Sequence, residues 1–257
     1  MFVDNLNPIA FVFGPFVIRW YGVFLGLAVL IISIILIKLF KKNGFNEDTT
    51  LSLIIWLFLG GIIGARLGHI LFYEASYYFH NPIEIPFINH GGLSSHGLAI
   101  GLLISFFLFA KIKNKDWKKM ADLLSVPLPI LIIFVRLGNY FNSEIVGRAA
   151  NVPFAVLFPN YETYPIPRHP VQIYEILIGI ALLILMVYLY KKYPQKKPLW
   201  LFSCFLIAYF STRFLVEFTK EYEGLPPSFP FTIGQLLSIP FIIWAIILFK
   251  TNKNHLG

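Results

Sequence analysis

Charged residues and cysteine are scarce in this sequence of 257 residues. Only 13% of the residues are charged and 57% are apolar, whereas soluble domains are about 25% charged. An ordinary soluble domain is therefore excluded, and the composition indicates a polytopic membrane protein. The one cysteine, Cys204, stands inside an apolar stretch, so no internal disulfide can form and we expect the thiol to serve packing.

Several familiar motifs are missing as well. The sequence holds no P-loop, no dinucleotide-binding fingerprint and no Gly-x-Ser-x-Gly elbow. Its six histidines are scattered one by one, so none has the spacing of a metal site, and we expect neither a metal nor another cofactor. His80, His90 and His255 have the setting of ordinary loop residues.

Seven apolar stretches are each long enough to cross a bilayer, which takes roughly 17–25 residues. They lie near residues 20–40, 49–73, 96–112, 121–141, 171–190, 198–219 and 232–250. We therefore predict an all-α fold of seven transmembrane helices, forming one membrane domain over residues 1–257. Residues 1–19 are expected to form an interfacial arm, and the proline-rich segment 142–170 a small cap on the outer side.

Lysines gather in alternate connections between the predicted spans. Groups of three, five, four and two lysines follow the first, third, fifth and seventh spans, within residues 38–42, 111–119, 191–197 and 250–253. The positive-inside rule then places the N-terminus outside and the C-terminus in the cytoplasm. The formal net charge of +8 thus reports topology, and no nucleic-acid partner is expected.

Three arginines lie within the predicted spans, in the outer portions of their helices: Arg66, Arg136 and Arg213. Ionisable groups are costly at membrane depth and normally mark a functional site. Their shared depth favours convergence on a lipid phosphate, for which guanidinium offers a planar fork. The alternative is that each pairs internally and fixes helix register, for instance Arg213 with Glu217.

Each arginine shares a helix face with other polar residues. Helical spacing places together Arg136 with Asn139, Tyr140 and Ser143, Arg66 with His69 and Tyr73, and Arg213 with Tyr209 and Glu217. The face that starts at Arg136 could clamp an anionic head group.

Two histidines begin predicted spans. Ser94 or Ser95 can cap the third span and leave His96 in its first turn. The helix dipole disfavours a charged imidazole there, so His96 is expected to be neutral and able to accept a proton. His169 precedes Pro170 at the start of the fifth span, where an anchor for the cap is the favoured interpretation.

The run from Arg136 to Gly147 resembles the signature of prolipoprotein diacylglyceryl transferases, in which Arg-x-Gly-Asn precedes Asn-x-Glu-x-x-Gly. Nearly the whole chain is similar to that family in order. The further matching stretches are Arg19-Trp20-Tyr21-Gly22, Gly64-Ala65-Arg66-Leu67-Gly68, Ser95-His96-Gly97, Pro167-Arg168-His169-Pro170, and Tyr209 with Arg213. Each motif is weak alone, but the ordered set is specific.

The resemblance implies transfer of the diacylglyceryl group of phosphatidylglycerol to the lipobox cysteine of a prolipoprotein. A thioether forms and glycerol-1-phosphate leaves. His96 corresponds to the family's essential histidine, and Arg136 and Arg213 to its essential arginines. The residues expected to bind substrate or shape the site are Tyr21, Arg66, His69, Tyr73, Asn139, Asn142, Glu144, Gly147, His169 and Tyr209.

We expect the protein to be a monomer, and the resemblance implies the bacterial cytoplasmic (inner) membrane as its location. Its partners would be phosphatidylglycerol, lipobox-containing signal peptides and other membrane lipids, without a metal or cofactor. Because the substrate supplies the thiol nucleophile, the enzyme needs no reactive cysteine of its own. Three positions depart from the family pattern: Val135, Leu98 and His69, the last of which adds a second candidate base.

Two other functions stay open at this point. A proton-coupled transporter could use Arg66, Arg136, His96 and Glu144 as a relay, but the inner halves of the spans hold few ionisable residues, chiefly Glu175 and Asp122. A scaffold could bind phosphatidylglycerol without reacting, since binding and catalysis would use the same arginines.

Overall fold

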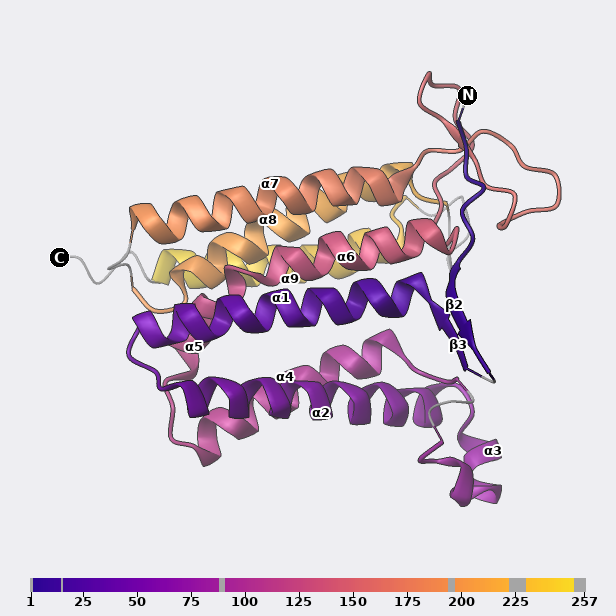
Figure 1. The fold of residues 1–257 in the computed structure, drawn as a ribbon. Coiled ribbons are helices and arrows are strands. Elements are labelled where there is room, and N and C mark those ends of the chain that lie inside the picture. Colours follow the sequence, from indigo (N-terminus) through magenta and orange to yellow (C-terminus); the bar gives the residue numbers. More distant parts are fainter. Residues whose placement is uncertain (1, 15, 88–90, 194–196, 222–229, 252–257) are drawn as a thin grey trace. The chain divides into compact units, whose positions relative to one another are not determined.

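The computed structural model describes residues 2–14, 16–87, 91–193, 197–221 and 230–251 (Figure 1). Residues His90 and His255, expected to be loop residues, lie outside these ranges. The chain forms two compact units, Met1–Leu36 with Ala121–Gly257, and Ile37–Met120. Each unit is described by itself below.

The first unit is built mainly from long helices (Figure 1). Its elements are β1 (Phe2–Val3), β2 (Ile9–Phe13), β3 (Phe16–Arg19), most of α1 (Trp20–Lys42), the end of α5 (Trp117–Ser125), α6 (Leu128–Phe141), β4 (Val156–Leu157), α7 (Val171–Lys192), α8 (Trp200–Val216), η3 (Glu217–Thr219) and α9 (Ile233–Thr251). Many large apolar side chains on the helices are exposed, among them Leu30 at 56% and Ile184 at 66%. Such apolar surfaces fit contact with lipid.

The expected fold class, an all-α polytopic membrane protein, is confirmed. Among the described helices, six are long and apolar enough to span a membrane, or seven if α5 and α6 count as one span. The predicted span at 121–141 is not continuous, because α5 and α6 meet at a 47° bend. Pro127 lies at the break; proline lacks the backbone N–H of a regular helix and disfavours helical geometry in the residue before it.

Aromatic contacts join the start of α1 to the end of α6. The ring of Phe141 lies 5.6 Å from that of Trp20 and 5.1 Å from that of Phe24. Gly138 completes the contact, since a Cβ there would come within 2.6 Å of a ring carbon of Tyr21. This packing fixes Tyr21 beside the outlet of α6.

At the opposite end of this bundle, Asp122 caps α8. Its carboxylate accepts hydrogen bonds from the backbone N–H groups of Leu199 and Phe202, at 2.7 and 2.8 Å. Carboxylates stabilise the positive end of a helix dipole. Asp122 therefore has a structural use, which leaves fewer ionisable residues to continue the relay of the transporter alternative toward the cytoplasm.

The N-terminal residues contact the segment 142–170, which is predicted to form the cap. β1 pairs in parallel with β4, so Phe2 stands opposite Val156. Asp4 is 2% exposed and accepts a hydrogen bond of 2.9 Å from the Ser143 hydroxyl. The rest of the expected arm is the hairpin β2–β3, with Phe13 79% exposed. A position of this hairpin in the membrane interface stays a prediction.

The second unit contains α2 (Glu47–Phe72), α3 (Ala75–His80), η1 (Pro82–Glu84) and α4 (Ser95–Ile112), with the end of α1 and the start of α5. Helices α2 and α4 meet through glycines. A Cβ at Gly64 would lie 2.5 Å from the carbonyl oxygen of Gly97, and one at Gly101 would lie 2.1 Å from that of Gly60. Only glycine permits so close a backbone approach.

Candidate active site

The residues after α6 form a tight turn. Ser143 and Ile145 both have positive φ, 51° and 55°, which is unusual for any residue with a Cβ and a clear outlier for a β-branched one. Strained backbone of this kind gathers at functional sites. Glu144 lies between these two residues, so the signature motif adopts an uncommon backbone conformation at this turn.

Hydrogen bonds from three directions hold the turn. The Glu144 N–H donates to the Asn139 carbonyl at 2.8 Å, and the Gln172 side chain donates to the Glu144 carbonyl at 2.7 Å. Ser143 is tied to Asp4 as described above. Elements from the end of α6, the start of α7 and the N-terminus thus fix where Glu144 lies.

The side chains of the signature form one hydrogen-bonded chain. Arg136 Nη1 donates to Asn139 Oδ1 at 2.9 Å, and Asn139 Nδ2 donates to Glu144 Oε2 at 3.0 Å. Asn142 Nδ2 donates to the other Glu144 oxygen at 3.1 Å. The structure therefore brings together four of the residues predicted for the site.

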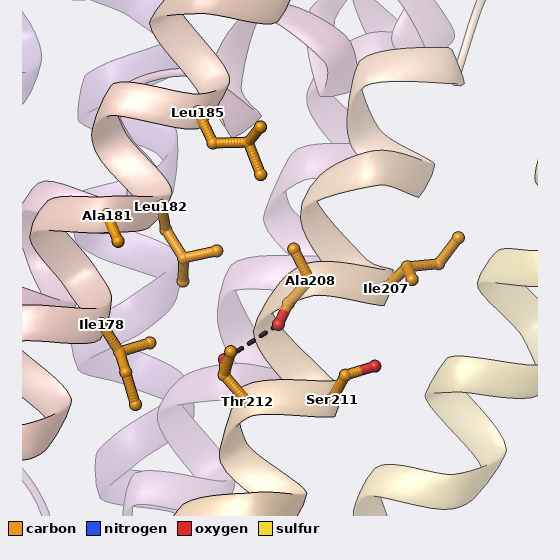
Figure 2. Close-up of a pocket in the computed structure, with 8 residues that line it drawn as sticks. All are labelled: Ile178, Ala181, Leu182, Leu185, Ile207, Ala208, Ser211 and Thr212. Atoms are coloured by element: carbon orange, nitrogen blue, oxygen red, sulfur yellow. Dashed lines mark hydrogen bonds between the residues drawn. The ribbon is translucent and has the colours of Figure 1, made fainter.

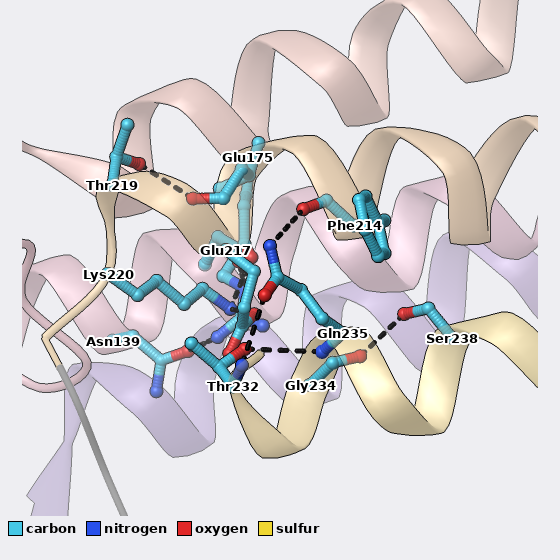
Figure 3. Close-up of polar contacts among 12 residues, drawn as sticks. Asn139, Glu175, Phe214, Glu217, Thr219, Lys220, Thr232, Gly234, Gln235 and Ser238 are labelled. Carbon is cyan, nitrogen blue, oxygen red and sulfur yellow. Dashed lines mark hydrogen bonds and ion pairs between the residues drawn. The ribbon is translucent and has the colours of Figure 1, made fainter. Parts of the chain in front are cut away.

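Beside this chain lies a buried ionic cluster (Figure 3). One carboxylate oxygen of Glu175 pairs with Arg136 Nε, and the other lies 2.8 Å from Lys220 Nζ. Lys220 Nζ is also 3.3 Å from Glu217 Oε2. Gly234 packs against that second carboxylate, since a Cβ would meet its atoms at 2.4 Å. The cluster joins α6, α7, η3 and α9.

Arg213 reaches the same cluster from α8. It lies one helical turn after Tyr209 and one helical turn before Glu217, and the charges of Glu217 and Glu175 act on its guanidinium electrostatically. The Tyr209 ring stacks on Phe205 with centroids 5.7 Å apart. The alternative for Arg213, internal pairing with Glu217, stays a prediction, since the partner that the structure gives the Glu217 carboxylate is Lys220, at 3.3 Å.

Arg136 keeps donors that the cluster does not use. A guanidinium has five N–H donors. In Arg136, Nε pairs with Glu175 and Nη1 with Asn139, while Nη2 has no acceptor among the described residues. The side chain is 13% exposed. A desolvated guanidinium with donors to spare is suited to bind an anion.

Gly147 lies where three backbone segments cross. Its N–H donates to the His169 carbonyl at 3.0 Å, and it forms a β-bridge with Lys220. A Cβ at position 147 would lie 2.5 Å from the Cβ of His169. His169 Nδ1 is 2.9 Å from the Tyr174 hydroxyl. Gly147 and His169 therefore join the cap to the ionic cluster, whereas contact of either residue with substrate stays a prediction.

An apolar recess of about 350 Å³ lies between α7 and α8 (Figure 2). Its walls come from both helices: Ile178, Ala181, Leu182, Leu185, Ile207, Ala208, Ser211 and Thr212. The Thr212 hydroxyl donates to the Ala208 carbonyl at 2.8 Å, which hides its polarity. The recess begins one helical turn from Glu175 and one residue from Arg213.

In the second unit, Arg66 is 4% exposed and all its donors are engaged. Its five N–H groups bond to five backbone carbonyls at 2.7–3.2 Å, those of Glu84, Ile85, Phe87, Gly91 and Gly92. The guanidinium also lies over the Tyr78 ring, 4.8 Å from its centroid. Arg66 holds a loop, and its predicted contact with substrate would require these bonds to be exchanged.

The other predicted residues of this unit lie near the same loop. His69 Nε2 is 3.4 Å from Glu74 Oε2, and its ring stacks on Tyr73 at 5.8 Å. His96 is the second residue of α4, and Ser94 caps that helix by accepting from the Gly97 N–H at 3.2 Å. Convergence of these residues with Arg136 and Arg213, which belong to the first unit, stays a prediction.

Comparison with known proteins identifies the chain. The family model of prolipoprotein diacylglyceryl transferases matches residues 8–251. The phosphatidylglycerol–prolipoprotein diacylglyceryl transferase of Tolumonas auensis is 34% identical over 255 residues, which cover 98% of this chain and 97% of that protein. The protein of the same name from Chloroherpeton thalassium is 36% identical over 256 residues, with coverage of 97% and 94%. The chain belongs to the prolipoprotein diacylglyceryl transferase family.

Membership confirms the family and the transferase class predicted from the sequence. It also places the chain among multi-pass bacterial membrane proteins, and neither the transporter nor the scaffold is favoured. Within the described residues, no group of three or more His, Cys, Asp or Glu side chains could hold a metal ion.

Sequence reasoning missed two members of this transferase's ionic cluster. In the sequence, Glu175 is only one of the few ionisable residues in the inner halves of the spans, and Lys220 is not predicted for the site. A carboxylate inside an apolar helix is itself a signal of function, so Glu175 could have been found. Nothing local marks Lys220, because its partners come from other elements.

Proposed function

We propose that this chain transfers the diacylglyceryl group of phosphatidylglycerol to the cysteine thiol of a prolipoprotein, with the lipid phosphate bound by Arg136 and Arg213. The names of the relatives supply the reaction. The observation that carries the site is the ion pair of Glu175 with Arg136 from α6, with donors left over on Arg136, while Arg213 on α8 lies within electrostatic range of Glu175. Charge-assisted, partly pre-organised donors are suited to a phosphodiester.

The chemistry then needs little from the protein besides electrostatics and a base. The substrate sulfur attacks the diacylglycerol carbon that carries the phosphate ester, so a C–S bond forms as the C–O bond breaks. The electron pair of that bond leaves with glycerol phosphate, and Arg136 and Arg213 stabilise the charge on its oxygens. The thiol has an ordinary pKa of about 8.5, and its proton passes to His96, or to His69 as the second candidate.

Glu144 and its amide neighbours suit the other end of the head group. The Glu144 carboxylate is held by Asn139 and Asn142 at the outlet of α6, and Tyr21 packs against the same turn of that helix. Carboxylate oxygens have several acceptor sites, so Glu144 can take hydrogen bonds from the hydroxyls of the terminal glycerol. These contacts would orient the phosphate ester relative to Arg136.

The apolar recess between α7 and α8 fits one acyl chain of the same lipid. Its first residues, Ile178 and Thr212, follow Glu175 and precede Arg213 in the respective helices. An acyl chain there would extend away from the phosphate along apolar side chains. Because the bilayer interior is itself apolar, such a recess would orient the acyl chain by packing rather than add a hydrophobic driving force.

The placement in the cell is part of the proposal. The lysine-rich connections favour a cytoplasmic C-terminus and an outer N-terminus in the bacterial inner membrane. The site would then open to the outer side, beneath the cap of residues 142–170. We propose that the chain works as a monomer with lipobox-containing signal peptides as its protein substrates.

Purified protein incubated with phosphatidylglycerol and a fluorescent lipobox peptide tests the activity. We expect release of glycerol phosphate and a thioether-linked lipopeptide, both dependent on the peptide cysteine. A matched peptide with serine in place of that cysteine is the control. If phosphatidylglycerol binds but no product forms, while a known transferase works in the same assay, the proposed reaction is wrong.

A further inference from the structure

Lys220 is a buried lysine between two carboxylates. Its residue exposure is 7%, and its amine lies 2.8 Å from Glu175 Oε1 and 3.3 Å from Glu217 Oε2. Lysine is almost never fully buried unless it is paired. The position therefore has an electrostatic use, which the reaction described above does not include.

The backbone of Lys220 is fixed by the cap. Gly147 forms a β-bridge with it, and Arg148 Nε donates to its carbonyl at 2.7 Å. Its own N–H donates to the Glu217 carbonyl at 3.3 Å. These backbone contacts fix the position from which the Lys220 side chain extends to Glu175.

The two oxygens of Glu175 have different partners. Oε2 pairs with Arg136 Nε, and Oε1 pairs with Lys220. Without Lys220, Oε1 would be a buried carboxylate oxygen without a hydrogen-bond donor. An unsatisfied buried acceptor costs free energy, so Oε1 would pair with another donor. Arg136, which already pairs with Oε2, has N–H donors to spare that can meet this need.

We propose that Lys220 is a positioning residue that holds Glu175 away from the phosphate-facing N–H donors of Arg136 and Arg213. The inference rests on the proposed function, because it concerns the same lipid phosphate. Arg136, Arg213 and Lys220 carry three positive charges against two on Glu175 and Glu217, so the cluster keeps one excess positive charge. A bound phosphodiester neutralises it. Removal of Lys220 makes the cluster neutral and turns Glu175 into a competitor of the phosphate.

A double-mutant cycle on the apparent KM for phosphatidylglycerol in mixed micelles tests this role. We expect Lys220→Met to raise KM at least about tenfold, and Lys220→Arg to stay within about threefold of the unmodified chain. Adding Glu175→Gln to Lys220→Met removes the competitor and restores the excess charge. The double variant should therefore recover most of the lost affinity for the lipid.

A second test compares the KM of Glu175→Gln with the KM of the double variant. This test does not depend on how well the single variant Lys220→Met folds. Once residue 175 is neutral, removal of Lys220 should change KM by less than about threefold. Lys191→Met, at an exposed lysine in the last turn of α7, is the matched control and should leave KM unchanged.

Two outcomes would overturn the proposal. If Lys220→Met leaves KM unchanged, Glu175 does not compete with the phosphate. If the double variant binds the lipid as weakly as Lys220→Met, or more weakly, Lys220 contacts the phosphate itself. Failure of the unmodified chain to release glycerol phosphate is a separate result, which rejects the proposed function and not the internal contacts of the cluster.

Discussion

Arg66 and Arg136 are both arginines inside apolar helices, one in each compact unit, and their partners differ in kind. Arg66 donates all five N–H groups to backbone carbonyls of one loop. Arg136 is held by two side chains, Glu175 and Asn139. Backbone carbonyls cannot leave without unfolding the loop, whereas side-chain partners can shift when a ligand arrives. Spare donors and exchangeable partners therefore distinguish a binding arginine from a structural one.

Of the substitutions that test this comparison, removal of Arg136 should have the largest effect, and the effect should be on activity. Arg136→Ala takes away the guanidinium that binds the lipid phosphate in our proposal, so kcat/KM should fall about 10²–10³-fold, as when one charge-stabilising donor is lost. Glycerol phosphate release measures the effect. Arg136→Lys keeps the charge but lacks the planar fork, so it should recover only part of the activity. Near-normal transfer by Arg136→Ala would contradict the phosphate role.

Removal of Arg66 should act on stability instead. Arg66→Ala leaves five backbone carbonyls without their partner, so we expect a loss of roughly 3 kcal/mol in the free energy of unfolding. For a chain of this size, that lowers Tm by roughly 6–12 °C. Thermal unfolding in detergent gives the value, with Lys41→Ala at an exposed position as control. An unchanged Tm with a raised KM would instead support the predicted contact of Arg66 with substrate.

The glycine contact between α2 and α4, in the same unit as Arg66, should have a smaller effect on stability. Gly101→Ala places a methyl group 2.1 Å from the Gly60 carbonyl oxygen, so α2 and α4 must separate, at a cost of about 1–3 kcal/mol. Gly26→Ala in α1 is the matched control, because a Cβ there meets nothing within 4 Å. Equal Tm values for the two variants would show that α2 and α4 tolerate a wider spacing.

A third arginine, Arg168 in the segment 142–170, sharpens the comparison because its partner Glu162 is partly exposed, with a side-chain exposure of 23% against 7% for Glu175. Its Nε and Nη2 donate to the two oxygens of Glu162 at 2.9 and 2.7 Å. These hydrogen bonds hold the pKa of Glu162 below its ordinary value of 4.5. Because the folded-state pKa is the lower one, the stabilisation is complete above pH 4.5 and is lost as the pH falls through the lowered value.

Glu162→Gln should therefore flatten the acid side of the stability profile. The Tm of the unmodified chain should fall more steeply below pH 4.5 than that of the variant. At neutral pH the difference in Tm should be small, about 1–3 °C, since partly exposed ion pairs contribute about 0.2–1 kcal/mol. Parallel profiles for the two proteins would show that this pair does not stabilise the cap.

Much of the membrane architecture follows from local sequence. Apolar runs of sufficient length predict the helices, and Ser94 was among the expected caps of α4. The bend between α5 and α6 was not predicted, although Pro127 marks its place. Helical spacing also placed Arg136 and Asn139 on one face, and these two residues are hydrogen-bonded.

The sequence by itself determined the class of protein, its helices and the polar motif after α6, because each depends on composition or on neighbours a few residues apart. Only the tertiary structure decided which arginine keeps free donors. Lys220 lies 45 residues beyond Glu175 in the chain, and Ser143 is 139 residues from Asp4. Such partners meet only through packing of separate elements. A buried charge takes its function from these partners, since they fix how many of its hydrogen bonds remain for a ligand.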